Sequence, residues 1–197
     1  KQQSAQTIKG VIPNIQLLYN PQMKSSYNFV PGVMGMILML LCAMMTSISI
    51  VREKENGTME VLLVSPMRPI FIILAKMVPY MVLSFANLLT ILLLSVYLLH
   101  VPIAGNIGLL FSVSFLFIMV TLFIGLLISN IVNTQVLAMM ISGLMLMMPT
   151  VFLSGMVFPV ESMPKLLQWL SCAMPARWYI QAMRKVMIEG VGLPYVF

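Results

Sequence analysis

The sequence predicts an all-α integral membrane protein, built as a bundle of membrane-spanning helices. Of its 197 residues, 60% are hydrophobic and only 8% are charged. A soluble domain of this size carries about a quarter charged residues. The mean hydropathy of +1.02 also places the chain in the membrane class. The net charge of +6 comes from residues scattered at the ends of apolar runs, so it indicates membrane-surface contacts and not nucleic-acid binding.

Four stretches are long and apolar enough to cross a bilayer, which takes ~20 residues of helix. The stretches are about 31–51, 70–99, 107–131 and 136–152. Pro31 and Gly32 mark the predicted start of the first. The second exceeds the hydrocarbon thickness, so it must tilt or protrude. Pro149 is predicted to kink the fourth or to end it early.

Three other segments connect or flank these spans. Residues 1–30 are polar, and 52–69 form a loop that opens with four alternating charges. Residues 154–197 are semi-polar, and within them residues 161–190 are predicted to form a re-entrant hairpin followed by an external amphipathic helix. Because the chain starts at Lys1 and not at a methionine, we expect it to be a segment of a longer protein.

The loop 52–69 is the most informative segment of the sequence. Gly57 is expected to allow a sharp turn, and Thr58 to cap a short helix that has Glu60 in its first turn. Met59 and Leu62 fall on one face of that helix. The pattern predicts a short amphipathic helix against the membrane surface. The alternative is a loop whose charges are merely solvated.

This loop resembles the signature loop of ABC-2 type transporter permeases. Two other regions resemble the same family, in the same order along the chain: an entry into the first span here, and a hairpin before a final span. The matching stretches are Arg52-Glu53-Lys54-Glu55-Asn56-Gly57-Thr58-Met59-Glu60-Val61-Leu62-Leu63-Val64-Ser65-Pro66, Tyr19-Asn20-Pro21 with Phe29-Val30-Pro31-Gly32, and Phe152-Leu153-Ser154-Gly155-Met156-Val157-Phe158-Pro159 with Met163-Pro164.

The resemblance implies six spans in the whole subunit, of which this chain would hold the second to the fifth. Residues 1–30 would be the tail of an external domain, and 31–197 the ABC-2 transmembrane domain. The loop 52–69 would be cytoplasmic and the hairpin 154–197 external. Counting Lys and Arg on each side gives the opposite orientation, but external domains are translocated largely regardless of charge. We therefore adopt the orientation of the family.

The family also implies partners. Its short cytoplasmic helix, the coupling helix, docks on a separate ATPase subunit, and a second permease subunit, like or unlike the first, completes the transporter. ATP would be bound by the partner, with no cofactor in this chain, and the protein would lie in the inner (plasma) membrane. The residues expected to contact the ATPase are Glu53, Glu55, Gly57, Thr58, Met59, Glu60 and Leu62.

Two further groups of residues are candidates for the transport path. Ser84, Asn87 and Thr90 lie roughly on one face of the second span, where they line a substrate pathway or form interhelical hydrogen bonds. In the family the hairpin caps the pathway on the outside. Its candidate gate residues here are Pro159, Glu161, Pro164 and Trp178.

The sequence favours a transport subunit over an enzyme. It has no phosphate-binding glycine loop, no paired carboxylates in its spans and no nucleophile with a nearby histidine, so no catalytic or metal site is expected. The 21 methionines are interpreted as adaptable packing and not as metal ligands. Two alternatives remain open: an ion-gradient-driven transporter, and a membrane subunit that only transmits force.

Overall fold

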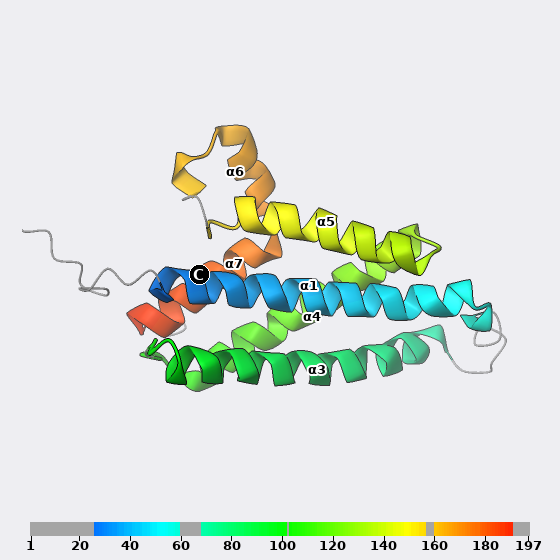
Figure 1. Cartoon of the computed structure of the whole chain (residues 1–197), viewed down its shortest axis with the longest axis horizontal. Helices are drawn as coiled ribbons and strands as arrows, with labels where there is room; N and C mark the ends of the chain where they lie inside the picture. The colour runs from blue at the N-terminus through cyan, green and yellow to red at the C-terminus, as the bar shows by residue number, and fades with distance from the viewer. Residues whose placement is uncertain (1–25, 60–67, 102, 157–159, 191–197) are drawn as a thin grey trace, which may run out of the picture.

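The computed structural model describes residues 26–59, 68–101, 103–156 and 160–190. Within these ranges the protein is all helical, and four helices are long and apolar enough to cross a membrane. They are α1 (Ser26–Glu55), α3 (Pro69–Tyr97), α4 (Ile107–Ile131) and α5 (Gln135–Leu153). Figure 1 shows the four lying side by side along the long axis of the molecule. The predicted fold class is therefore confirmed.

Helix α1 is the centre of the bundle. It contacts α3, α4 and α5, and half of its most apolar 18-residue window is buried, against 22% for α3 and for α5. Its side chains Met34, Leu38 and Met39 are fully buried in the main apolar core. The outer helices depend on α1 for most of their packing, so displacement of α1 must affect the whole bundle.

The contact between α1 and α4 is close because a glycine lies in it. A Cβ atom on Gly125 would lie 2.6 Å from the carbonyl oxygen of Ala43 and 2.9 Å from the Cβ of Thr46. Gly125 and Ser129 lie one helical turn apart, and small residues at this spacing are typical of close packing between membrane helices. Ser129 is also buried.

Two prolines do not limit the helices as the sequence predicted. Helix α1 begins at Ser26, so Pro31, and with it the boundary expected between residues 30 and 31, lies inside the helix. Helix α5 likewise continues past Pro149 to Leu153. A proline removes one backbone hydrogen bond and crowds the preceding turn, which membrane helices tolerate when neighbouring groups compensate.

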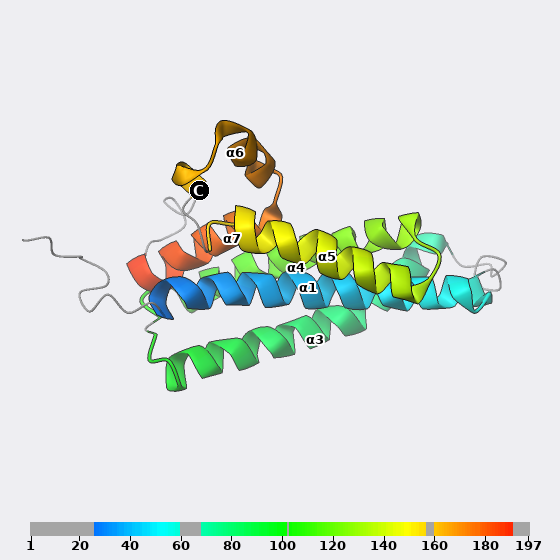
Figure 2. The same cartoon turned by 45° about the horizontal axis from the view of Figure 1, so that its top comes forward.

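The hairpin consists of a 3₁₀ turn at Val160–Ser162, helix α6 (Lys165–Cys172), helix α7 (Pro175–Arg184) and a π-helical turn at Lys185–Glu189. Figure 2 shows α6 standing away from the bundle beside α5, while α7 lies against the bundle. Helix α7 packs its apolar face on α1 and α4. The predicted amphipathic helix is therefore present, and these two helices cover its apolar face.

The π-helical turn joins the hairpin to the loop between α3 and α4. The backbone N–H of Ala104 donates to the carbonyl of Met187 at 2.9 Å. A Cβ on Gly105 would lie 2.3 Å from the carbonyl oxygen of Val186, so this approach requires glycine. These contacts attach the hairpin to the end of the bundle opposite the last turn of α1.

Candidate functional site at the charged end of the bundle

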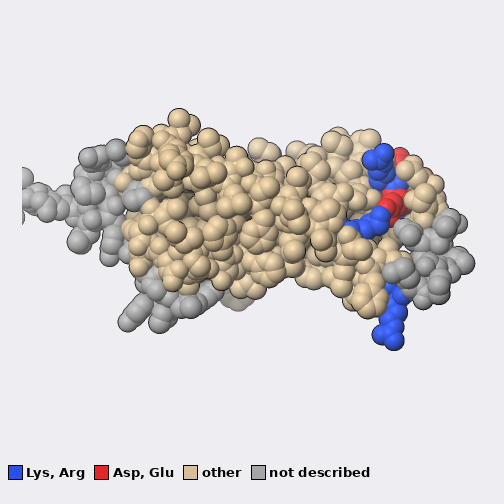
Figure 3. All heavy atoms as spheres, turned by 90° about the horizontal axis from the view of Figure 1, so that it is seen from below, with Lys and Arg blue, Asp and Glu red and all other residues tan. Residues whose placement is uncertain are grey.

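The four alternating charges form the last turn of α1, and Figure 3 shows lysine, arginine and glutamate gathered at this one end of the visible face. We call residues 52–55 the charged tetrad. After it the chain turns at Asn56 and Gly57, and helical backbone resumes at Thr58. Gly57 has a φ of +71°, in the left-handed region where a side chain is strained. The expected turn at Gly57 is therefore present in the backbone.

The Thr58 hydroxyl donates to the backbone carbonyl of Glu53 at 3.2 Å. The sequence predicted that Thr58 would cap the start of the next helix, but its described hydrogen bond is to the end of α1. The last carbonyls of a helix have no partner within the helix, so a nearby hydroxyl binds there readily.

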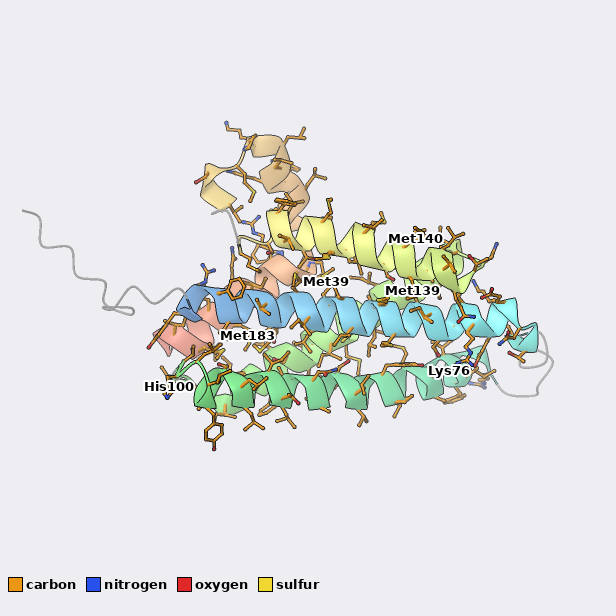
Figure 4. The ribbon with its side chains drawn as sticks, in the orientation of Figure 1. Met39, Lys76, His100, Met139, Met140 and Met183 are labelled. Carbon is orange, nitrogen blue, oxygen red and sulfur yellow. The ribbon has the colours of Figure 1, made fainter. Side chains whose placement is uncertain are left out.

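Glu53 forms an ion pair with Lys76 of α3. Both side chains are partly buried, 21% exposed for Glu53 and 28% for Lys76. Figure 4 shows Lys76 at the end of α3 that lies beside the tetrad. The family resemblance predicts that Glu53 contacts an ATPase subunit. In the structure the Glu53 carboxylate is paired with Lys76 of its own chain.

Lys54 donates to the backbone carbonyl of Ser129, in the last turn of α4. The carbonyls of this turn lack partners within the helix and carry the negative end of the helix dipole, which favours a cation. Lys54 was not among the residues expected to act at this site.

Glu55 binds the first residue of α5. Its Oε2 atom accepts from the backbone N–H of Gln135 at 3.1 Å and from the Gln135 side-chain amide at 2.9 Å. A carboxylate is favoured at a helix N-terminus, where backbone N–H groups are unpaired. Glu55, like Glu53, is therefore bound by a helix of its own chain, and the expected contact of both with an ATPase subunit stays a prediction.

Arg52 and Glu55 are the exposed members of the tetrad, and the Arg52 side chain has no hydrogen bond or ion pair within the described ranges. Met59 is half-buried next to the turn. Glu60 and Leu62, the remaining residues expected to contact an ATPase, lie outside the described residues.

The three polar residues of α3 do not form one strip inside this chain. Ser84 is buried and lies 2.9 Å from the Sγ of Cys42 on α1, with a second hydrogen bond to the carbonyl of Tyr80. Thr90 is exposed and bonds the carbonyl of Ala86 in its own helix. Asn87 is half-buried. Ser84 thus shows the interhelical contact that was one of the two readings.

The candidate gate residues are spread over the hairpin. Pro159 lies outside the described residues, and Glu161 lies in the 3₁₀ turn. Pro164 immediately precedes α6. The Trp178 indole N–H donates to the carbonyl of Cys172 at 3.0 Å and joins the end of α6 to α7. The structure thus places Trp178 at the corner of the hairpin.

Tyr179 fixes α7 to α4. Its hydroxyl lies 3.0 Å from the Ser114 hydroxyl, and its ring stacks on Phe117 with centroids 4.1 Å apart. Burial raises the pKa of the Tyr179 phenol above its ordinary value, so the hydroxyl remains protonated and able to donate.

We expect Tyr179→Phe to lower the free energy of unfolding by about 0.5–1.5 kcal/mol, since it keeps the stacked ring but removes a buried hydrogen bond. Tyr97→Phe is the matched control, because Tyr97 is 77% exposed. Thermal unfolding of the purified protein compares the two variants. An equal loss of stability in both would contradict the role of the buried hydroxyl.

The described residues contain no group of three or more His, Cys, Asp or Glu side chains placed to hold a metal ion. His100 lies exposed after α3, and Cys42 and Cys172 are free thiols. The chemistry of the charged end is that of ion pairs and hydrogen bonds to helix ends.

Comparison with known proteins agrees with this architecture. The family model described as "ABC-2 type transporter" matches residues 5–188. The chain is 33% identical over 195 residues, 98% of its length and 51% of the relative, to the probable multidrug ABC transporter permease YbhS of Escherichia coli (strain K12). It is 32% identical over 179 residues to the probable multidrug ABC transporter permease YbhR of the same organism, covering 91% of this chain and 48% of the relative.

A more distant organism provides a third relative. The chain is 32% identical over 188 residues to ABC transporter G family member 20 of Dictyostelium discoideum, covering 95% of this chain and 25% of that protein. No solved structure gives a significant match. The chain spans about half the length of the Escherichia coli relatives it matches. The four apolar helices and these matches together show that the chain belongs to the ABC-2 type transporter family.

Proposed function

We propose that this chain is part of the permease subunit of an ATP-driven exporter in the inner (plasma) membrane. A separate ATPase subunit binds and hydrolyses ATP, and this chain contributes part of the membrane path. The observation that carries the proposal is an exposed turn beside a charged helix end in a four-helix membrane bundle of this family. We place that charged end in the cytoplasm, as the resemblance of the loop implies.

The coupling element begins at this turn. Asn56, Gly57 and Thr58 are exposed beyond the end of α1, so a soluble partner can reach them. Gly57 sets the direction in which the following segment leaves α1. In this proposal the segment from Gly57 through Met59, Glu60 and Leu62 docks on the ATPase subunit.

A second permease subunit packs against α5 in this proposal. In the most apolar 18-residue stretch of α5, only 22% of the residues are buried within this chain. Its exposed surface is rich in methionine, whose flexible thioether side chains adapt to varied apolar shapes. These residues are Met139, Met140, Met145, Met147 and Met148, and Figure 4 labels the first two. The same surface suits a hydrophobic or amphipathic substrate moving between two subunits.

Export of a hydrophobic substrate is also supported by a hollow of about 260 Å³ between α4 and α7. Val113, Val120 and Trp178 are among the apolar and aromatic side chains that line it. The two Escherichia coli relatives are named as probable multidrug permeases. Apolar hollows with aromatic walls favour apolar over strongly charged ligands.

An ion-gradient-driven transporter would need ionisable groups within its spans. In the described parts of the four spans, the charged side chains are confined to the tetrad and Lys76, all at one end. This arrangement favours coupling at the charged end over proton or ion relay through the membrane. A subunit that only transmits force is the remaining alternative.

Purification of the full-length protein, co-expressed with the genes adjacent to its own, tests the proposal. We expect an ATP-hydrolysing subunit to co-purify, and ATP to drive substrate movement in reconstituted vesicles. If no ATPase subunit is retained and an ion gradient alone drives flux, the proposal is wrong. Retention of the ATPase without any substrate movement would favour the force-transmitting alternative.

A further inference from the structure

Three consecutive side chains at the end of α1 bind the ends of three different helices. Glu53 pairs with Lys76 of α3, Lys54 binds the carbonyl of Ser129 on α4, and Glu55 binds Gln135 on α5. We propose that residues 53–55 form an interhelical clamp, which makes the coupling turn and all four membrane helices move as one unit. The inference rests on the proposed function and assigns a positioning role to each charge.

The geometry of an α-helix explains why three neighbours are reached. Successive residues are rotated by about 100° around the helix axis, so residues 53, 54 and 55 point in three different directions. Because α1 is the central helix, each of these directions meets another helix. The charges of residues 53–55 alternate in sign, and each sign suits the group that its side chain contacts.

The sign of each clamp charge complements its target. The cation Lys54 meets the carbonyl end of α4, and the anion Glu55 meets the amide end of α5. The anion Glu53 meets the ammonium of Lys76. Reversal of any one charge would therefore replace an attraction with a repulsion at that helix.

Packing alone holds the outer helices weakly. In a bilayer there is no hydrophobic force between apolar helices, so association depends on close packing and polar contacts. Helix α3 contacts α1 and α4. In its most apolar 18-residue stretch, only 22% of the residues are buried. The Glu53–Lys76 ion pair is thus a directional link that sets the position of α3 relative to the coupling turn.

The four charges of the tetrad do not all bind within the chain. The side chains of Glu53, Lys54 and Glu55 contact other helices, whereas the exposed Arg52 side chain has no partner in the described part of the chain. Arg52 is therefore the member assigned to the ATPase subunit, and its guanidinium fits a carboxylate on that partner. This assignment replaces Glu53 and Glu55 with Arg52 as the ionic contact to the ATPase.

Charge reversal in the full-length permease, assembled with its ATPase subunit in phospholipid nanodiscs, tests the clamp. Three quantities are measured: the ATPase subunit retained per permease, the hydrolysis rate per retained ATPase subunit, and the thermal midpoint. We expect Glu53→Lys and Lys76→Glu each to lower the hydrolysis rate per retained subunit at least fivefold while retention stays within twofold. The double reversal should restore the rate to within twofold of the wild type.

Milder substitutions at Glu55 guard against loss of folding, and one at Arg52 tests the contact with the ATPase subunit. Glu55→Gln keeps a carbonyl oxygen that can accept from Gln135, so it should reduce the rate less than Glu55→Ala. Arg52→Gln should show the opposite signature: retention falls severalfold and the thermal midpoint is unchanged.

Several results would overturn the clamp. These are unaffected hydrolysis in both single reversals, no recovery in the double reversal, or a loss of thermal midpoint alone with a normal rate per retained subunit. If the wild type retains no ATPase subunit, it is the proposed function that fails. The thermal midpoints of the Glu53 and Lys76 variants then test the clamp by themselves. A midpoint that recovers in the double reversal supports the clamp, and one that stays low excludes it.

Discussion

Replacement of Gly125 by alanine is expected to loosen the bundle at its centre. The added Cβ would lie 2.6 Å from the carbonyl oxygen of Ala43 and 3.0 Å from the Ala43 Cα. Both are backbone atoms of the central helix, so they cannot turn aside as a flexible side chain can. Overpacking of this kind costs about 1–3 kcal/mol of stability.

Gly143→Ala is the matched control for this substitution. Gly143 lies inside α5, and a Cβ there would meet nothing within 4 Å. Alanine has the higher helix propensity, by about 1 kcal/mol in water, so stability should stay level or rise. Thermal unfolding of the full-length variants measures the difference. A loss at position 143 equal to that at 125 would show that the α1–α4 distance does not limit stability.

Replacement of Gly57 by valine is expected to uncouple the ATPase subunit from the membrane helices. Gly57 has a φ of +71°, and this conformation costs a residue with a side chain about 1–2 kcal/mol. The cost is higher for a β-branched residue. Since 1.4 kcal/mol corresponds to a tenfold change in an equilibrium, the equilibrium constant for forming the turn should fall about tenfold. ATP-driven activity of the assembled complex should fall by up to the same factor.

Gly57→Asn separates backbone strain from the loss of space. Asparagine adopts the left-handed region more readily than valine does, so it should retain most of the activity. A Cβ on residue 57 would touch nothing within 4 Å, so steric exclusion cannot account for a difference between the two variants. Normal coupling in Gly57→Val would show that the positive φ is not needed for transmission.

Several features of the protein follow from the sequence by local physics. Four runs of apolar residues must be helices because a lipid-exposed backbone has to satisfy its own hydrogen bonds. The predicted third span, 107–131, has the same limits as helix α4. Gly57 was expected to make a turn, because only glycine adopts a positive φ at low cost, and the backbone there has that geometry. The family was recognisable because its motifs lie in contiguous stretches.

Prolines were a less reliable guide to helix limits. Pro31 was expected to mark the start of a span, but α1 begins before it, at Ser26. Pro149 was expected to kink α5 or to end it early, and α5 continues past it to Leu153. The amphipathic pattern of α7 correctly indicates one apolar face. A pattern cannot say what covers that face, and in the structure α1 and α4 cover it.

The partners of the tetrad were decided by the tertiary structure alone. Lys54 and Ser129 are 75 residues apart, and Glu55 and Gln135 are 80 apart. A charge run in a sequence does not reveal which helix end each side chain will meet, so solvated and docked charges look the same. The sequence by itself determined the position and apolar character of the four described membrane helices, because these depend on each segment and the lipid. Only the packing of α3, α4 and α5 around α1 decided that three charges bind within the chain and that Arg52 faces outward.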